Sequence, residues 1–199
     1  MTLDPTVTVA VLDWDVVKVA LPLDKHEWHP SMLAGQIVLI STLDAEGHPN
    51  VAPKSWVTMV AFAEPIVAFG CNVTHATYAN VIETREFVVN VLGEPLARRA
   101  WALSDVHGDD RFRDSGLTLV AASAVAAPLI DECPAHLECE FDDVKYYGDE
   151  VFIFGRVVAA WIDELIGPST VDSYERLAPV FFLERGTYAG LGEVHHLSL

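Results

Sequence analysis

Basic side chains are scarce in this sequence. The 199 residues include 12 Lys and Arg against 29 Asp and Glu, which gives a formal net charge of −17. Nucleic acids and anionic membrane surfaces are bound through clusters of Lys and Arg. We therefore expect the chain to bind neither nucleic acid nor membrane.

Cysteines and long apolar runs are also few. The three cysteines, Cys71, Cys133 and Cys139, form no C-x-x-C pair, which is typical of a reduced, intracellular protein. No uninterrupted apolar run approaches the roughly 20 residues needed to cross a bilayer. The N-terminal segment is acidic where a secretory signal would be basic. The sequence therefore predicts a cytoplasmic protein.

The common nucleotide and hydrolase motifs are missing as well. The chain has no G-x-G-x-x-G, no P-loop lysine motif and no G-x-S-x-G elbow, which argues against a Rossmann dehydrogenase or an α/β-hydrolase. It also has no internal repeat and no evident linker, so one domain is expected.

What the chain does contain is many short β-branched and aromatic runs, separated by turn residues. We expect strands at 36–42, 51–62, 66–70, 87–92, 137–147, 151–162 and 181–183. We expect short helices at 78–84, 94–103 and 170–177. Many antiparallel strands with a few short helices predict a mainly β, closed barrel.

One segment, residues 47–82, is nearly free of acids. An even spread of acids would place about five there, but the segment holds only Glu64, beside His48, Lys54 and His75. Such a gap in a strongly acidic chain leaves room for a bound anion. Buried strands also exclude charge, but burial does not explain the uncharged hydrogen-bond donors between the apolar runs.

The first group of donors is Thr74-His75-x-Thr77, with Asn72 and Asn80 nearby. We predict that Thr77 is the N-cap of helix 78–84. Free N–H groups at a helix N-terminus bind phosphate, and hydroxyl and imidazole donors reinforce them. The alternative is ordinary N-capping by Thr77 with no ligand.

The second group is Lys54-Ser55-Trp56. Such donors can bond the edge of a heterocycle, while an aromatic side chain covers the apolar surface beside it. The alternative is a solvated lysine next to a core tryptophan. Together the two groups predict an anionic, planar ligand.

Histidine pairs occur elsewhere in the chain. His26-x-x-His29 has a spacing that can bind metal in a helix, but Pro30 follows directly and no third ligand is evident. His195-His196 lies in a C-terminal segment that we interpret as a tail rather than a site. We therefore expect no metal.

Several motifs, taken in order, resemble the flavin reductase-like family of FMN-binding split barrels. They are His29-Pro30-Ser31, Ile40-Ser-Thr42, Gly47-x-Pro49-Asn50-x-Ala52-Pro53-x-Ser55, Thr77-x-x-Asn80, Glu86-Phe-Val-Val-Asn90, Asp110-x-Phe112-x-x-Ser115-Gly116-Leu117, Glu138-Cys139-Glu140, Gly148-Asp149, Phe154-Gly155-x-Val157 and Tyr188-x-x-Leu191-Gly192. The resemblance covers roughly residues 28–194.

The resemblance implies a six-stranded antiparallel split barrel with Greek-key topology and a few short peripheral helices. It implies a homodimer with FMN near the dimer interface. Residues 28–194 would form the FMN-binding domain, with an N-terminal extension at 1–27 packed on the barrel and a C-terminal tail at 195–199.

The resemblance also assigns the site residues. The isoalloxazine would be lined by Pro53, Lys54, Ser55 and Trp56. The flavin edge, ribityl chain and phosphate would be held by Asn72, Val73, His75 and Thr77, and Asn80 would support their loop. Many relatives have Lys-Asp-Thr or a similar polar-basic triplet before the helix, where this chain has His75-Ala76-Thr77.

The implied activity is NADH- or NADPH-dependent reduction of flavin, with the reduced flavin serving an oxygenase or another acceptor. No catalytic acid or base is assigned, because the cofactor performs the redox chemistry and the protein binds and orients it. One alternative is a flavoredoxin-type electron carrier or a non-catalytic FMN-binding protein. Another is a metal- or haem-binding split barrel that uses His26, His29 or His75.

Overall fold

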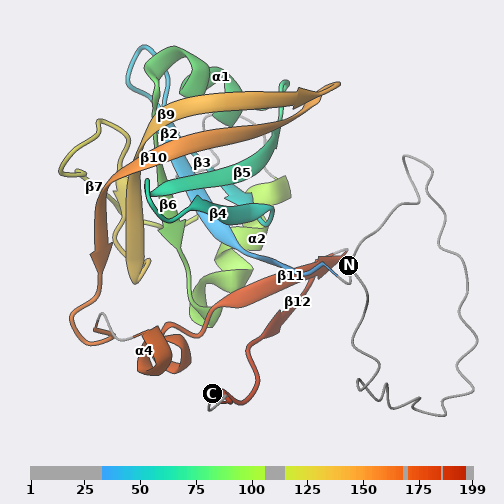
Figure 1. Cartoon of the computed structure of the whole chain (residues 1–199), viewed down its shortest axis with the longest axis vertical. Helices are drawn as coiled ribbons and strands as arrows, with labels where there is room; N and C mark the ends of the chain where they lie inside the picture. Colours follow the sequence, from blue (N-terminus) through green and yellow to red (C-terminus); the bar gives the residue numbers. More distant parts are fainter. Residues whose placement is uncertain (1–32, 106–114, 168–169, 185, 196–199) are drawn as a thin grey trace, which may run out of the picture. The chain divides into compact units, whose positions relative to one another are not determined.

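The computed structural model describes residues 33–105, 115–167, 170–184 and 186–195 (Figure 1). All of them belong to one compact unit, residues 31–199. The expected N-terminal extension at 1–27 lies outside the described residues, as do His26, His29 and His196. None of the described helices is long and apolar enough to cross a membrane.

The main element is a seven-stranded sheet in which all neighbouring strands are antiparallel. Its order is β3-β2-β6-β9-β10-β5-β4. The strands are β2 (Val38–Leu43), β3 (Pro49–Lys54), β4 (Val57–Ala61), β5 (Ile66–Asn72), β6 (Glu86–Val91), β9 (Ala135–Tyr147) and β10 (Glu150–Ile162).

The two edge strands of this sheet, β3 and β4, are consecutive in the chain. Only Ser55 and Trp56 separate them, so the sheet must curl until its edges meet at this corner, which leaves a barrel with an open seam. The mainly β, antiparallel split barrel is confirmed, with seven strands rather than six. The expected single strand 51–62 was wrong, because the chain breaks at Ser55-Trp56 and begins a second strand there.

A smaller sheet has the order β1-β11-β12 and comprises β1 (Gly35–Gln36), β11 (Val180–Glu184) and β12 (Thr187–Gly190). A two-stranded pair joins β7 (Leu119–Val120) to β8 (Leu129–Ile130). The strand expected at 181–183 is β11. The other four short strands were not predicted, because each is too short or too glycine-rich to show a period of two.

Four helical segments accompany the sheets in the described residues: α1 (Ala76–Thr84), η1 (Glu94–Leu96), α2 (Ala97–Asp105) and α4 (Thr170–Leu177). Helix α1 lies between β5 and β6 in the chain, and η1 with α2 accounts for the helix expected at 94–103. Helix α1 begins two residues earlier than expected. Its N-cap is His75, so the prediction that Thr77 caps it was wrong.

The interior of the barrel is filled by side chains. Along β2, Leu39 and Ile40 enter different core clusters, as the alternation of a strand requires. In the barrel cluster, Phe69 and Phe87 meet edge to face at 5.1 Å between ring centroids. The barrel interior therefore leaves no room for a ligand, which must bind outside it.

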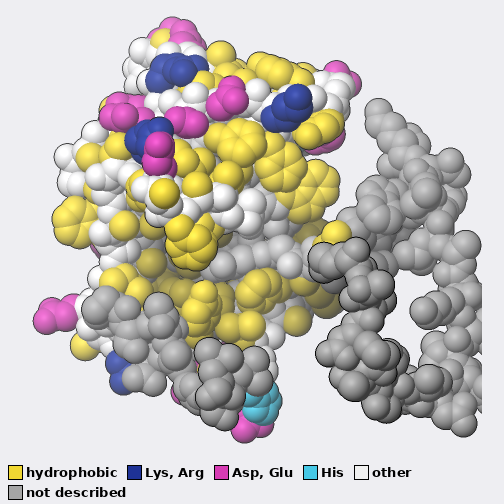
Figure 2. Space-filling model, viewed as in Figure 1, with side chains coloured by type: hydrophobic (Ala, Val, Ile, Leu, Met, Phe, Trp, Pro, Cys, Tyr) yellow, Lys and Arg dark blue, Asp and Glu magenta, His cyan; other side chains and the backbone are white. Residues whose placement is uncertain are grey.

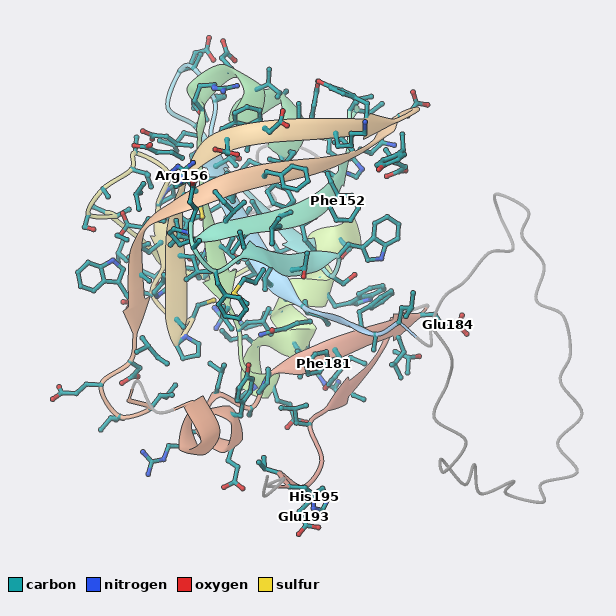
Figure 3. All side chains as sticks on the ribbon, viewed as in Figure 1. Phe152, Arg156, Phe181, Glu184, Glu193 and His195 are labelled. Atoms are coloured by element: carbon teal, nitrogen blue, oxygen red, sulfur yellow. The ribbon has the colours of Figure 1, made fainter. Side chains whose placement is uncertain are left out.

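Two further contacts tie β10 to its surroundings. Arg156 on β10 pairs with Glu64, in the turn before β5, at 2.5 Å and with Asp142 of β9 at 3.1 Å (Figure 3). These pairs join three neighbouring segments on one exposed face.

Hydrophobic side chains are gathered over the side of the molecule seen in Figure 2. Among the apolar residues of β4 and of the turn after it, Met59 is 57% exposed and Phe62 is 90% exposed.

Candidate functional site

The two donor groups found in the sequence meet in space. Lys54, at the end of β3, places its Nζ 3.2 Å from Nδ1 of His75, the N-cap of α1, although the two residues are 21 positions apart. The corner between β3 and β4 and the N-terminus of α1 therefore form one continuous polar surface.

The start of α1 is organised by Asn72. Its Oδ1 accepts hydrogen bonds from the backbone N–H of Thr74 at 3.0 Å and from the Thr74 hydroxyl at 2.7 Å. Its Nδ2 donates to Oε1 of Glu150 at 3.1 Å. Asn72 thus builds the turn, so the hydroxyl of Thr77 is not needed to start the helix.

The first turn of α1 carries no acid, and His75 makes no side-chain cap hydrogen bond. Acidic residues are normally favoured in the first turn of a helix, because the helix dipole is positive at that end. In a chain with a net charge of −17, an acid-free first turn whose N–H groups lack a capping side chain can accept an external anion.

Thr77 and Asn80 face inward rather than toward solvent. Thr77 is 1% exposed and accepts a hydrogen bond from Nδ2 of Asn50 at 3.1 Å, while Asn80 donates to Oγ1 of Thr42 at 3.0 Å. Since Thr42 and Asn50 lie on β2 and β3, this buried cluster anchors α1 to the sheet. Any contact of Thr77 with a ligand in this arrangement would use its backbone N–H.

Val73 and Cys71 complete this end of the site. Val73 packs against the barrel core, and its N–H donates to the carbonyl of Asp149 at 2.9 Å. The Cys71 thiol lies 3.8 Å from Nδ1 of His75. Burial raises its pKa more than the nearby Lys54 lowers it, so the thiol stays protonated at neutral pH and is a poor nucleophile.

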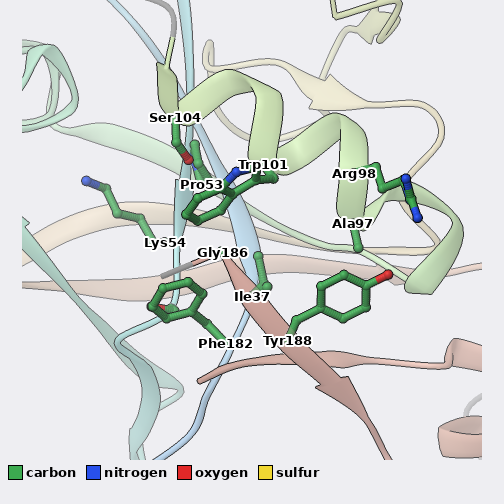
Figure 4. Close-up of a pocket in the computed structure, with 11 residues that line it drawn as sticks. Ile37, Pro53, Lys54, Ala97, Arg98, Trp101, Ser104, Phe182, Gly186 and Tyr188 are labelled. Atoms are coloured by element: carbon green, nitrogen blue, oxygen red, sulfur yellow. The ribbon is translucent and has the colours of Figure 1, made fainter. Parts of the chain in front are cut away.

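A pocket of about 570 Å³ opens on the other side of Lys54, between the end of β3, helix α2 and the strands β11 and β12 (Figure 4). Its lining residues are Ile37, Pro53, Lys54, Ser55, Ala97, Arg98, Trp101, Ser104, Phe182, Gly186 and Tyr188. Trp101 stacks on Phe182 with ring centroids 5.8 Å apart and an angle of 17° between the planes. An aromatic wall with two cationic side chains suits a planar ligand that carries negative charge.

The predicted residues thus fall into two groups that share Lys54. Pro53, Lys54 and Ser55 line the pocket, whereas Asn72, Val73, His75, Thr77 and Asn80 belong to the start of α1 and its supports. Trp56 lies outside the pocket lining. Its ring rests on Gly70, where an added Cβ would come within 2.7 Å of the indole, and it remains 55% exposed.

The α2 wall of the pocket was not predicted from the sequence. At helical spacing, Trp101 falls on one apolar face with Leu96, Ala97 and Ala100. Those three are buried, but Trp101 is 43% exposed, so it lies at the margin of that face. An aromatic residue at the edge of an apolar stripe was the available signal.

One group of possible metal ligands lies in the turn between β2 and β3. Ligand atoms of Asp44, Glu46 and His48 are within 4.8 Å of one another, and Nδ1 of His48 is 3.0 Å from Oδ2 of Asp44. These contacts also close the turn. His195 is exposed near the end of the described C-terminal segment (Figure 3).

Comparison with known proteins gives the same fold and a family. The chain is 33% identical over 110 residues to an uncharacterised protein of Pyrococcus abyssi, covering 55% of this chain and 64% of that one. It thus spans slightly less than two thirds of that relative. It is 27% identical over 128 residues to an NADH:riboflavin 5'-phosphate oxidoreductase of Streptomyces pristinaespiralis, covering 64% of this chain and 71% of the relative.

Among solved structures, the fold is similar to that of nitrilotriacetate monooxygenase component B from Bacillus cereus. The TM-score is 0.79 at 21% identity, over 91% of this chain and all of the other. The family model described as "Flavin reductase like domain" matches residues 31–183. This chain therefore belongs to the flavin reductase-like family of split-barrel proteins.

Proposed function

We propose that the protein binds FMN at the corner between β3 and β4 and reduces it with NADH or NADPH. The observation that carries the proposal is the acid-free first turn of α1 beside the Lys54 ammonium, in a chain whose net charge is −17. An aromatic pocket opens from the same lysine. A phosphate and a planar ring system joined in one ligand match these two features.

In the proposed complex, the phosphate lies against the backbone N–H groups at the start of α1, near Asn72 and His75. The isoalloxazine extends along Pro53, Ser55 and Trp56, and the ammonium of Lys54 points from the same corner toward the N-cap of α1. When bound, FMN accepts a hydride at its ring and passes electrons on. The residues of the chain bind and orient it, and Thr77 and Asn80 hold the binding loop in place through Thr42 and Asn50.

The nicotinamide donor and the electron acceptor both need access to the ring. The pocket walled by Trp101, Phe182 and Tyr188 adjoins Pro53 and Ser55, so we assign it to a planar partner of the flavin. The named relative from Streptomyces supports NADH as the donor. The name of the Bacillus cereus protein supports delivery of reduced flavin to an oxygenase.

We also propose a homodimer. The apolar side chains exposed on and after β4 (Figure 2) are of the kind that protein interfaces cover. Sedimentation or light scattering of the purified chain should give twice the monomer mass.

The activity is tested by mixing purified protein with FMN and either NADH or NADPH and following the loss of the reduced nucleotide. Oxidation that requires both protein and FMN is the expected result. Tight retention of FMN without oxidation of either nucleotide would make the protein an electron carrier of the flavoredoxin type instead. Absence of both flavin binding and oxidation would overturn the proposal.

A further inference from the structure

Lys54 brings a positive charge to the start of α1 from strand β3, a position at which the resemblance to relatives implies no cation for the phosphate. Relatives often carry the positive charge of the phosphate site in the triplet before the helix, and this chain has His75-Ala76-Thr77 there. We propose that Lys54, from strand β3, supplies that charge and makes the site select phosphorylated flavin over riboflavin. This inference rests on the proposed FMN site and adds the source of its specificity.

The direction of Lys54 follows from the strand that carries it. Strand β3 pairs with β2 in unbroken register from Pro49 to Lys54, so Asn50 and Lys54 share one face. Asn50 reaches α1, because its Nδ2 bonds to Oγ1 of Thr77. Lys54 therefore also faces α1, and its ammonium arrives at the N-cap.

The contact between Lys54 and His75 determines which hydrogen-bond donors a ligand can meet at this site. A lysine ammonium has donors only, so Nδ1 of His75 accepts at 3.2 Å and the ring proton resides on Nε2. The pair then presents one permanent positive charge and the ammonium hydrogens that do not bond to His75. These are donors of the kind that bind a phosphate oxygen.

The surroundings of Lys54 suit an anion that comes from outside. Of the ion pairs that the described residues form, none involves Lys54, although the chain has 29 acids. The carboxylate of Glu150, at the start of β10, meets this loop through a hydrogen bond from Asn72. A contact with a histidine does not neutralise the lysine, so its charge remains available.

The test compares dissociation constants for FMN and riboflavin in the full chain and its Lys54→Met variant. Losing a charge-assisted contact should weaken FMN binding by roughly 10- to 100-fold. Riboflavin has the same ring and no phosphate, so its binding should change by less than about twofold. The double variant Lys54→Met, His75→Lys returns a cation to the helix side and should recover at least about tenfold in FMN affinity over Lys54→Met.

Lys145→Met is the matched control, because it makes the same change in net charge. Lys145 neighbours Tyr146, whose hydroxyl meets that of Tyr78 on α1 at 2.9 Å, and alternation along β9 turns Lys145 to the opposite face. The Lys145→Met variant should bind both flavins with the same affinity as the unaltered chain. Lys54→Gln provides a second variant if Lys54→Met does not fold.

The inference fails if the unaltered chain binds FMN and either Lys54 variant keeps the same ratio of FMN to riboflavin affinity. It also fails if both flavins weaken equally while the melting temperature is unchanged, since Lys54 would then act on the ring. An unaltered, folded chain that binds no FMN would overturn the proposed function itself, which is a separate outcome.

Discussion

Trp161 donates its indole N–H to the buried carboxylate of Glu138, with 2.7 Å between Nε1 and Oε1. The same carboxylate accepts bonds from the N–H and hydroxyl of Ser123 and from the N–H of Ala124. Glu138 is fully buried. It therefore holds the loop that contains Ser123 and Ala124 against the sheet, opposite the end of β10.

Replacing Glu138 with Gln should destabilise the fold by about 3 kcal/mol, since an amide cannot accept all of these hydrogen bonds and brings donors of its own. Trp161→Phe removes one donor at a half-exposed position and should cost about 1.5 kcal/mol. Urea unfolding of both variants measures the difference. Equal stability of Glu138→Gln and the unaltered chain would show that the carboxylate is not needed to hold the loop.

Because the pKa of Glu138 is lowered in the folded chain, we expect the protein to lose stability in acid. Burial pushes the pKa of Glu138 upward, but its hydrogen bonds from Ala124, Ser123 and Trp161 outweigh burial and hold it at about 2, against an ordinary 4.5. Because the folded pKa lies below the unfolded one, this stability is complete above pH 4.5 and falls as pH drops toward 2. The Glu138→Gln variant should lose less stability over that window than the unaltered chain.

Gly155 on β10 is required by the packing of the barrel interior. A Cβ at this position would lie 2.2 Å from Cζ of Phe87, so Gly155→Ala should cost roughly 1–3 kcal/mol through forced repacking. Gly190→Ala is the control, because a Cβ there meets nothing within 4 Å. Thermal unfolding should separate the two variants clearly, and equal melting temperatures would contradict the packing described here.

Trp101 should matter for the partner of the flavin rather than for FMN itself. Trp101→Leu removes the ring stacked on Phe182 and should raise the KM for the reduced nucleotide about tenfold, the effect of about 1.4 kcal/mol of lost stacking. The affinity for FMN should change by less than about threefold. A variant with weakened FMN binding and an unaltered KM would place the flavin ring, not its partner, in this pocket.

Thr77 should act through its support of α1. Thr77→Ala removes the acceptor of the Asn50 amide and should lower stability by about 1–2 kcal/mol. With Ser55→Ala added, FMN affinity should fall more than about tenfold, because one change removes a polar contact with the ligand and the other loosens the start of α1 that holds the phosphate. Fluorescence titration with FMN measures this, and an unchanged affinity would mean that the site lies elsewhere.

Much of the fold could be predicted from the sequence, because β-branched and aromatic runs of strand length, such as those of β2, β6 and β10, favour strands directly. The break at Ser55-Trp56 could not be predicted, since residues on both sides of it favour strand. The start of α1 was misplaced because the side chain of Asn72, rather than Thr77, organises the turn. The hydroxyl of Thr77 instead accepts a hydrogen bond from Asn50, and this contact forms only when β3 and α1 come together in the folded chain.

The candidate site was predictable as a set of polar residues but not as a geometry. Lys54 was placed along the flavin ring, and its contact with His75 depends on the pairing of β3 with β2 and on the position of α1. Trp101, Phe182 and Tyr188 come from segments far from the acid-poor region. Only the folded chain brings them beside Pro53 and Ser55.

The central claim is that FMN binds at this corner of the barrel. Isothermal titration of flavin-free protein with FMN tests it most directly. We predict saturable binding of about one FMN per chain, with a dissociation constant of about 1 μM or below, and weaker binding in Lys54→Met. Folded protein that shows no heat of binding and no change in the flavin spectrum at saturating FMN would contradict the claim.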